Sequence, residues 1–266
     1  MNKDRHIDIM GIVNLTDDSY FAQSRCSGAE AALSRVSKML DEGATIIDIG
    51  ACSTRPGSVP VGPEEEWRRL APTLQLLTET YPDICISVDT WWSEIVSRTY
   101  DLIGDFIVND ISAGEDDLQM LSLVGQLGLK YVAMHKRGTS VNMHQLTDYV
   151  DVVGDVISYF NEFSVKALQF DIKNWILDPG FGFAKTIGQN YEMLSRLSEF
   201  TELNRPVLVG VSRKSMIYKL LNISPEESLA ATQVLHLKAL QQGADILRVH
   251  DVAEAARTIR LYRELE

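Results

Sequence analysis

The sequence predicts a single domain of the α/β class, a (β/α)8 TIM barrel with its site at the C-terminal ends of the strands. Three observations predict this fold. Short β-branched segments alternate eight times with helical patterns, no Ser/Gly/Pro-rich linker or low-complexity tract interrupts them, and polar residues follow the strand ends. The whole chain, residues 1–266, is therefore interpreted as one domain, and this length is normal for an α/β barrel.

Each predicted strand is a short apolar run, which is typical of a parallel strand that is buried on both faces. The predicted strands are residues 7–13, 45–49, 84–88, 105–108, 130–134, 175–177, 207–211 and 245–249. A doubly wound open sheet is the structural alternative, but it more naturally has five or six strands. Eight segments therefore favour the closed barrel.

Amphipathic segments between the strands predict the outer helices. The clearest are residues 29–42, 64–80, 148–170, 225–242 and 253–266. Pro63 and Pro225 stand where a proline fits the first turn of a helix, because the first turn does not need that N–H group.

The composition limits the classes of function. A net charge of −12 argues against a nucleic-acid or anionic-membrane surface, so an anionic substrate needs a local basic cluster. No apolar run approaches the roughly 20 residues that span a bilayer, and the first residues are too charged for a signal peptide, so a cytoplasmic protein is expected. Three cysteines without a Cys-x-x-Cys pair support neither a disulfide framework nor a zinc site.

Polar or glycine residues follow every predicted strand. They lie at 14–19, 53–57, 89, 109, 134–135, 178–183, 213–215 and 248–250. At any one strand end such a residue can equally be a turn or a helix cap. Complementary chemistry at all the strand ends favours a site, because the loops at the carboxyl ends of barrel strands assemble the site.

These residues form two sets by charge. Asp89, Asn109 and Asp178 are rich in acceptors and suit a flat ligand with adjacent N–H donors, such as an aminopyrimidinone. The opposite set suits a phosphate or pyrophosphate, and its Asn14 can supply an oxygen ligand for Mg²⁺. This second set consists of Arg55, Lys214, Arg248 and His250, together with Asn14.

Other motifs have simpler explanations. Residues 180–186 look like a phosphate-binding P-loop, but Ala184 stands where the glycine before Lys185 belongs. His236 is better explained as a packed helical residue than as a metal ligand. For His135, just past a strand end, two interpretations stay open: it lines the site, or it only bonds to backbone.

With these motifs in place, the chain resembles the dihydropteroate synthase family of pterin-binding barrels, from about residue 10 to residue 252. The motifs that carry the resemblance follow in order: 10–16 (MGIVNLT), 48–50 (DIG), 53–57 (STRPG), 87–90 (SVDT), 109–112 (NDIS), 178–183 (DPGFGF), 212–215 (SRKS) and 248–251 (RVHD). The resemblance implies that 6-hydroxymethyl-7,8-dihydropterin pyrophosphate reacts with 4-aminobenzoate, with Mg²⁺ assistance, to give 7,8-dihydropteroate and pyrophosphate.

The resemblance also implies roles for individual residues. Those implied to bind the pterin are Asp89, Asn109, Asp178 and Lys214, with Met134 and Phe183 lining the pocket. Those implied to bind the diphosphate and the metal are Asn14, Arg55, Arg248 and His250. Thr54, Pro56 and Ser215 are implied to seat 4-aminobenzoate. Lys214, Arg248, His250 and Arg55 are the residues expected to act in catalysis.

The sequence departs from the family pattern in its first two loops and after Lys214. Asp17 stands for a proline, Tyr20 for a phenylalanine, Cys52 for a glutamate and Tyr218 for a glycine. None of these changes removes a residue implied to bind the pterin or the phosphates.

Two other functions compete with the synthase. A pterin-dependent methyltransferase shares the barrel and the Asp/Asn/Asp pocket, but it has no pyrophosphate for residues 55–57 and 212–215 to bind. A non-catalytic pterin-binding paralogue is the other, and the intact basic residues argue against it. The resemblance further implies a homodimer, and apolar residues of the segment 225–242 can supply its surface.

Overall fold

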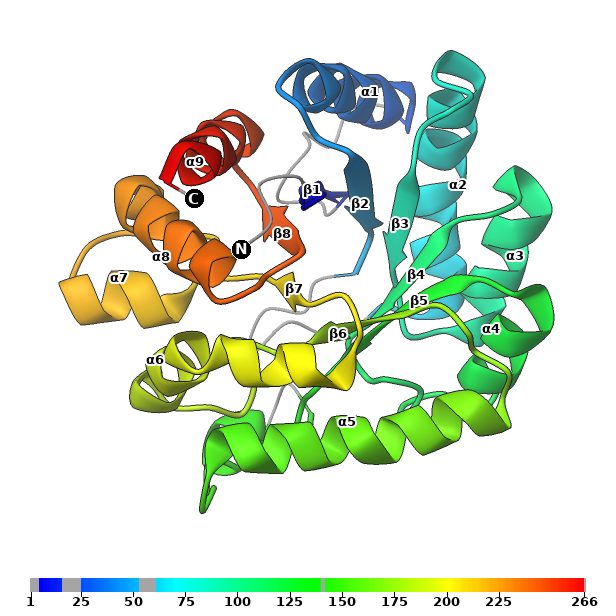
Figure 1. Ribbon diagram of the computed structural model, residues 1–266. Coiled ribbons are helices and arrows are strands. Elements are labelled where there is room, and N and C mark those ends of the chain that lie inside the picture. The colour runs from blue at the N-terminus through cyan, green and yellow to red at the C-terminus, as the bar shows by residue number, and fades with distance from the viewer. Residues whose placement is uncertain (1–4, 16–24, 53–60, 140–141, 266) are drawn as a thin grey trace.

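The strands form a closed parallel barrel that the helices surround (Figure 1). The computed structural model describes residues 5–15, 25–52, 61–139 and 142–265. Among them eight strands pair in the order β6-β5-β4-β3-β2-β1-β8-β7, all in parallel. A parallel bridge between Leu177 and Val207 joins the two ends of this order and closes the barrel. The predicted (β/α)8 barrel is confirmed, and the open sheet is not formed.

Every predicted strand is present. The strand at 130–134 has its predicted bounds, and the bounds of the others shift by one or two residues. The strands are β1 (Asp8–Asn14), β2 (Ile46–Gly50), β3 (Ile86–Asp89), β4 (Ile107–Asp110), β5 (Lys130–Met134), β6 (Trp175–Asp178), β7 (Leu208–Val209) and β8 (Ile246–Val249). Strand β7 is the shortest of them, and it follows Pro206, which has no N–H group for a ladder bond.

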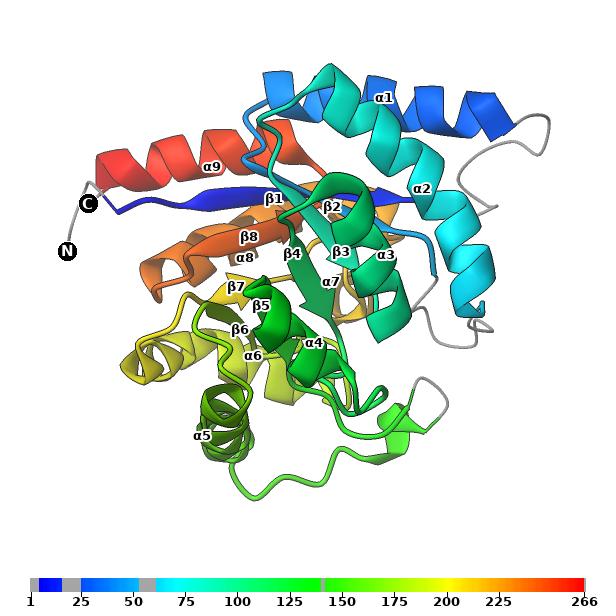
Figure 2. The ribbon, with the colours of Figure 1, turned by 90° about the vertical axis from the view of Figure 1, so that its right-hand side faces the viewer.

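The helices lie on the outside of the barrel, as Figure 2 shows from the side. They are α1 (Arg25–Asp41), α2 (Pro63–Thr80), α3 (Ser93–Ile103), α4 (Met120–Leu127), α5 (Val152–Gln169), α6 (Ile187–Ser195), α7 (Ser215–Leu221), α8 (Leu229–Gln241) and α9 (Val252–Leu265). Short 3₁₀ turns occupy η1 (Met143–Gln145), η2 (Leu197–Leu203) and η3 (Glu226–Ser228). No helix among the described residues is both long and apolar enough to cross a membrane.

The two prolines behave differently at the helix starts. Pro63 is the first residue of α2, as predicted. Pro225 does not open α8. Its carbonyl instead accepts hydrogen bonds from the backbone N–H of Ser228 at 3.3 Å and from the Ser228 hydroxyl at 2.6 Å, which closes the 3₁₀ turn η3. Helix α8 therefore begins only at Leu229.

A layer of apolar side chains fills the barrel interior and supports the site. It consists of Met10, Ile46, Ile107, Val132, Ile176, Leu208 and Ile246, one from each strand except β3. Successive side chains of a strand point to opposite faces, so the residue two positions after each member faces the interior as well. The polar side chains at the carboxyl ends of the strands therefore stand above this apolar layer.

Candidate functional site

Arg248 connects two carboxylates inside the barrel. Its Nε donates to Asp48 Oδ2 at 2.7 Å, and its Nη2 donates to Asp89 Oδ2 at 2.8 Å. Asp48 also accepts from Ser87 Oγ at 2.6 Å and from Asn109 Nδ2 at 3.2 Å. These contacts join strands β2, β3, β4 and β8 in one buried polar network.

The network leaves one acceptor unused. Asp89 Oδ1 is buried and has no hydrogen-bond partner among the described residues. Burial raises the pKa of Asp89 to about 7, although Arg248 acts to lower it. Burial alone would lower the pKa of Arg248, but Asp48 and Asp89 raise it overall, so Arg248 is a permanent cation at the site.

Asp178 begins a loop that turns back over the end of β6. Its Oδ1 accepts from the backbone N–H of Gly180 at 2.8 Å. Burial raises the pKa of Asp178, and Lys214 is the strongest influence that opposes this rise. Gly180 has a φ of +73°, and a Cβ there would lie 2.0 Å from the carbonyl oxygen of His135, so this turn requires glycine.

Lys214 lies against the same loop. Its Nζ donates to the carbonyl oxygen of Phe181 and lies 5.0 Å from the centroid of the Phe183 ring. Burial lowers the pKa of Lys214 to about 8, while Asp178 acts to raise it. The charge of Asp89 also acts to raise the pKa of Lys214.

His250 is a neutral member of the site. Burial, and then the nearby charge of Arg248, lower its pKa to about 4. Its Nδ1 lies 3.0 Å from Ser212 Oγ, which also accepts from the backbone N–H of His250 at 3.2 Å. With the Ser212 hydroxyl donating to Nδ1, Nε2 carries the ring proton and can donate to an anion.

Asn14 and Asp89 face a space that glycine keeps open. A Cβ on Gly50 would lie 3.6 Å from Asn14 Oδ1 and 3.3 Å from the Asp89 Cβ. The described residues contain no cluster of three His, Cys, Asp or Glu side chains that could hold a metal ion. A Mg²⁺ ion at this space would therefore take Asn14 as an oxygen ligand and its other ligands from phosphate oxygens and water, which is usual for Mg²⁺.

The structure brings most of the predicted residues together. Met134 pairs with Asp178 across β5 and β6, and Ser215 follows Lys214 at the start of α7. Thr54, Arg55 and Pro56 lie outside the described residues, as do Asp17 and Tyr20, so their roles stay predictions.

The two sets of residues, acceptor-rich and basic, lie in contact with each other. Arg248, placed with the phosphate-binding set, is bonded to Asp48 and Asp89, and Lys214 contacts the Asp178 loop. The physical reason is that buried carboxylates need counter-charges, and the nearest cations belong to the other set.

Asp48 is the functional residue that the sequence reasoning missed. It is fully buried and holds Arg248, Ser87 and Asn109 at once. Its position in the sequence could have indicated this role. Asp48 lies two residues after the interior residue Ile46, so its carboxylate is on the inner face of β2.

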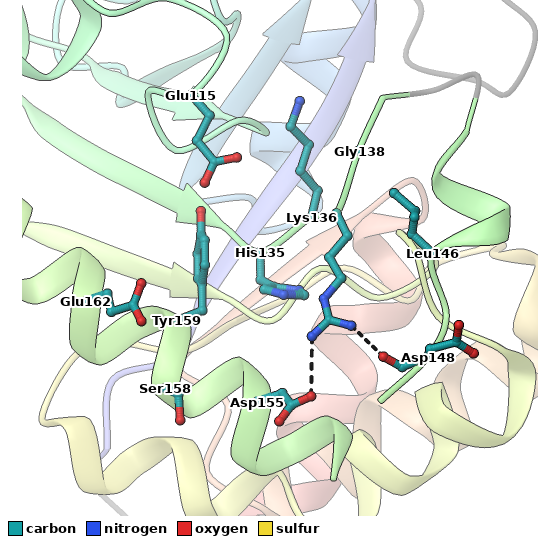
Figure 3. Close-up of a pocket in the computed structure, with 11 residues that line it drawn as sticks. Glu115, His135, Lys136, Gly138, Leu146, Asp148, Asp155, Ser158, Tyr159 and Glu162 are labelled. Carbon is teal, nitrogen blue, oxygen red and sulfur yellow. Dashed lines mark hydrogen bonds and ion pairs between the residues drawn. The ribbon is translucent and has the colours of Figure 1, made fainter. Parts of the chain in front are cut away.

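His135 has a side-chain partner besides a backbone contact, and both of its predicted settings stay open. Its Nδ1 lies 2.9 Å from the Nζ of Lys185, the lysine of the P-loop look-alike. On its other side lies a cavity of about 700 Å³ between α5 and the loop after β5, which Figure 3 shows. There the Tyr159 ring meets His135 edge-on at 4.9 Å between centroids, and Arg137 donates to the Asp148 carbonyl and to Asp155. The cavity lies outside the Asp89–Asp178 pocket.

His236 is buried within α8 beside Gln233, as predicted.

Comparisons with known proteins agree with this geometry. The sequence profile of the family described as "Pterin binding enzyme" matches residues 10–250. Dihydropteroate synthase of Escherichia coli strain K12 is 39% identical over 258 residues, which cover 96% of this chain and 90% of that protein.

Solved structures of the same enzyme have the same fold. A Yersinia pestis dihydropteroate synthase in complex with a sulfonamide drug superposes with a TM-score of 0.91 at 33% identity, covering 100% of this chain and 96% of that one. A Xanthomonas albilineans dihydropteroate synthase with 4-aminobenzoic acid superposes with a TM-score of 0.89 at 35% identity, covering 100% and 94%.

Proposed function

The chain belongs to the pterin-binding enzymes and, among them, to the dihydropteroate synthases, and from this premise we propose how its site works. The reaction joins 6-hydroxymethyl-7,8-dihydropterin pyrophosphate to 4-aminobenzoate, giving 7,8-dihydropteroate and pyrophosphate, a step of folate biosynthesis. The relatives are synthases, so the methyltransferase alternative has no support.

One observation supports the pterin half of the site most directly. Asp89 Oδ1 is buried without a partner among the described residues, so it needs an N–H donor from a ligand. Asp178 and Asn109 offer further oxygens on the same inner face, and an aminopyrimidinone edge presents adjacent N–H groups. Lys214 and the ring of Phe183 would then contact the pterin from the side of the Asp178 loop, with Met134 beside them.

The chemistry follows from the charges in the pocket. The bond between the methylene carbon and the pyrophosphate oxygen breaks, and its electron pair leaves with pyrophosphate. The electron-rich dihydropterin shares the developing positive charge, which the carboxylates of Asp89 and Asp178 stabilise. The lone pair of the 4-aminobenzoate amine forms the new bond to the methylene carbon, and the amine then loses one proton to the solvent. This amine is already neutral near pH 7, so it needs positioning more than a general base. No covalent enzyme intermediate is required.

The leaving group needs donors above the apolar layer. Neutral His250 can donate through Nε2, and Arg55 is proposed to supply a positive charge. Arg248 contributes charge from beneath, because its guanidinium is bonded to Asp48 and Asp89. We propose Mg²⁺ at the space beside Asn14 as the cofactor, where it would neutralise pyrophosphate charge when bound.

The second substrate is proposed to lie toward α7. Ser215, at the first position of α7 beside Lys214, is partly exposed and can contact the carboxylate or the ring of 4-aminobenzoate. Thr54 and Pro56 are proposed to complete this seat.

Turnover with and without Lys214 tests the function. Purified protein with Mg²⁺ and both substrates is expected to release dihydropteroate and pyrophosphate. Lys214→Ala is expected to lose most of this activity because it removes the buried amine that contacts the Asp178 loop. Chelation of Mg²⁺ with EDTA is expected to lower the rate. Tight pterin binding by the wild-type protein without any turnover would instead favour the non-catalytic binder.

We also propose a homodimer formed through α7 and α8. Leu220, Leu221 and Val234 are exposed apolar side chains on these two helices, whereas Leu240 of α8 faces the core. Light scattering is expected to give twice the mass of one chain, and a monomer at micromolar concentration would contradict the proposal.

A cytoplasmic location is proposed as well. The free thiols of Cys52 and Cys85 fit a reducing compartment, and the net charge of −12 fits a partner set of small molecules rather than nucleic acid or membrane.

A further inference from the structure

Lys185 is a buried lysine that contacts the loop after Asp178 and the side chain of His135. Its Nζ donates to the carbonyl oxygens of Gly180 and Phe183, each at 3.0 Å, and lies 2.9 Å from His135 Nδ1. The residue is 8% exposed. An ammonium group has three donors and no acceptor, so these three contacts use its whole hydrogen-bonding capacity.

The contact with Lys185 fixes the state of His135. When Lys185 is protonated its ammonium group only donates, so Nδ1 of His135 then accepts and the ring proton lies on Nε2. Burial, followed by the charge of Lys185, lowers the pKa of His135 to about 2. The His135 ring is therefore neutral.

The acceptors of Lys185 belong to the loop that carries Asp178. Gly180 donates its N–H to Asp178 Oδ1 and packs against the carbonyl group of His135. On the outer side of this loop, Phe181 accepts from Lys214 and Phe183 contributes the ring beside Lys214. The hydrogen bonds of Lys185 therefore hold the segment that contains Asp178 and contacts Lys214.

Lys185 also acts on the pocket through its charge. Burial raises the pKa of Asp178, and Lys214, Arg248 and Lys185 are the cations that oppose this rise. Burial lowers the pKa of Lys185 itself to about 7, Asp178 acts to raise it, and Lys214 and Arg137 act to lower it. The charge of Lys185 therefore acts to lower the pKa of Asp178, and the charge of Asp178 acts to raise the pKa of Lys185.

We propose that Lys185 is a positioning residue for pterin binding: together with His135, it holds the loop 178–183 in its binding shape. The inference rests on the proposed function, since it concerns the same pocket. The segment around Lys185 that looks like a P-loop would thereby support the pterin pocket.

The test compares Lys185→Met with Lys173→Met, a lysine whose side chain is 77% exposed. Binding of 6-hydroxymethyl-7,8-dihydropterin, which lacks the pyrophosphate, is measured by calorimetry between about pH 5.5 and pH 8.5. Lys185→Met is expected to weaken binding about tenfold at neutral pH. The acid limb, which is the range where affinity falls as the pH is lowered, is expected to move to higher pH, because losing a nearby cation raises the pKa of Asp178. Lys173→Met is expected to match the wild type. Asp89 contributes to the acid limb in every variant, so only the difference between variants is interpreted.

A second variant distinguishes the effect of the Lys185 charge from the effect of its geometry. It also keeps the inference testable if Lys185→Met does not fold. Lys185→Arg keeps the charge but not the compact three-donor head, so it is expected to weaken pterin binding with its acid limb unchanged. In turnover, both variants are expected to raise the KM for the pterin substrate more than the KM for 4-aminobenzoate.

The outcomes distinguish the inference from the function on which it rests. If the Lys185 variants bind the pterin with wild-type affinity and the same pH dependence, and only their melting temperature falls, Lys185 is a structural residue and the inference is wrong. If the wild-type protein itself does not bind the pterin, the proposed function fails instead.

Discussion

Replacement of Asp178 by alanine is expected to abolish binding of the pterin pyrophosphate while the barrel stays folded. Hydrogen bonds to a charged group contribute about 1.5 to 3 kcal/mol each, so losing them costs more than about tenfold in affinity. In the part of the chain that the structure describes, the Asp178 side chain makes one local hydrogen bond, from Gly180 N–H to Oδ1, so little of the described fold depends on it. Calorimetric titration measures the affinity, and circular dichroism checks the fold.

Asp178→Asn is the matched control for this prediction. Its amide oxygen can still accept from Gly180, but it carries no charge, so a similar loss of pterin affinity would assign the effect to the carboxylate. Because burial raises the pKa of Asp178, binding is expected to weaken as the pH falls through that raised pKa and to be complete above it. Near-normal binding by Asp178→Ala would rule out the pocket assignment.

The barrel was predictable because its strands repeat one physical pattern. Short apolar runs such as 46–50 and 175–178 are buried on both faces, and eight of them alternate with helices. The exact bounds were less predictable. Residues 207–211 read as a full strand, but only Leu208–Val209 form β7, since the pairing around Pro206 and Gly210 depends on how the barrel closes.

The site was predictable as a set of strand ends, but its internal contacts were not. Asp89, Asn109 and Asp178 all face the interior, as their positions after apolar runs suggested. The pairing of Arg248 with Asp48 spans 200 residues of sequence, and no local pattern indicates it. Partners across a barrel are decided by which buried charges need compensation, and that requires the closed fold.

The same pairing carries the largest expected effect on stability. Arg248→Met removes the guanidinium between Asp48 and Asp89 and leaves both carboxyl groups buried without their cation. Removing one partner of a buried ion pair costs about 3 to 5 kcal/mol in the free energy of unfolding. Urea denaturation of the wild type and the variant measures this loss.

The loss is expected to depend on pH in one direction. Burial raises the folded-state pKa of Asp89 to about 7, above its ordinary value of 3.8, so this group favours the folded state at low pH and loses that contribution as the pH rises toward 7. Arg248 limits the rise of this pKa, so without Arg248 the penalty for ionised Asp89 grows. The difference between wild type and Arg248→Met should therefore be larger at about pH 8 than at about pH 5.

Two further variants decide whether the buried pairing is the cause. Arg257→Met removes a guanidinium of α9 whose side chain is 75% exposed and which pairs only with Glu254 among the described residues, so little change in stability is expected. Adding Asp89→Asn to Arg248→Met removes the uncompensated charge and should recover part of the lost stability, most of it at the higher pH. Arg248→Met could lose no more free energy of unfolding than Arg257→Met, or lose the same amount at both pH values. Either result would show that Arg248 does not compensate the buried carboxylates. The electrostatic account of the pterin pocket would then have to be abandoned as well.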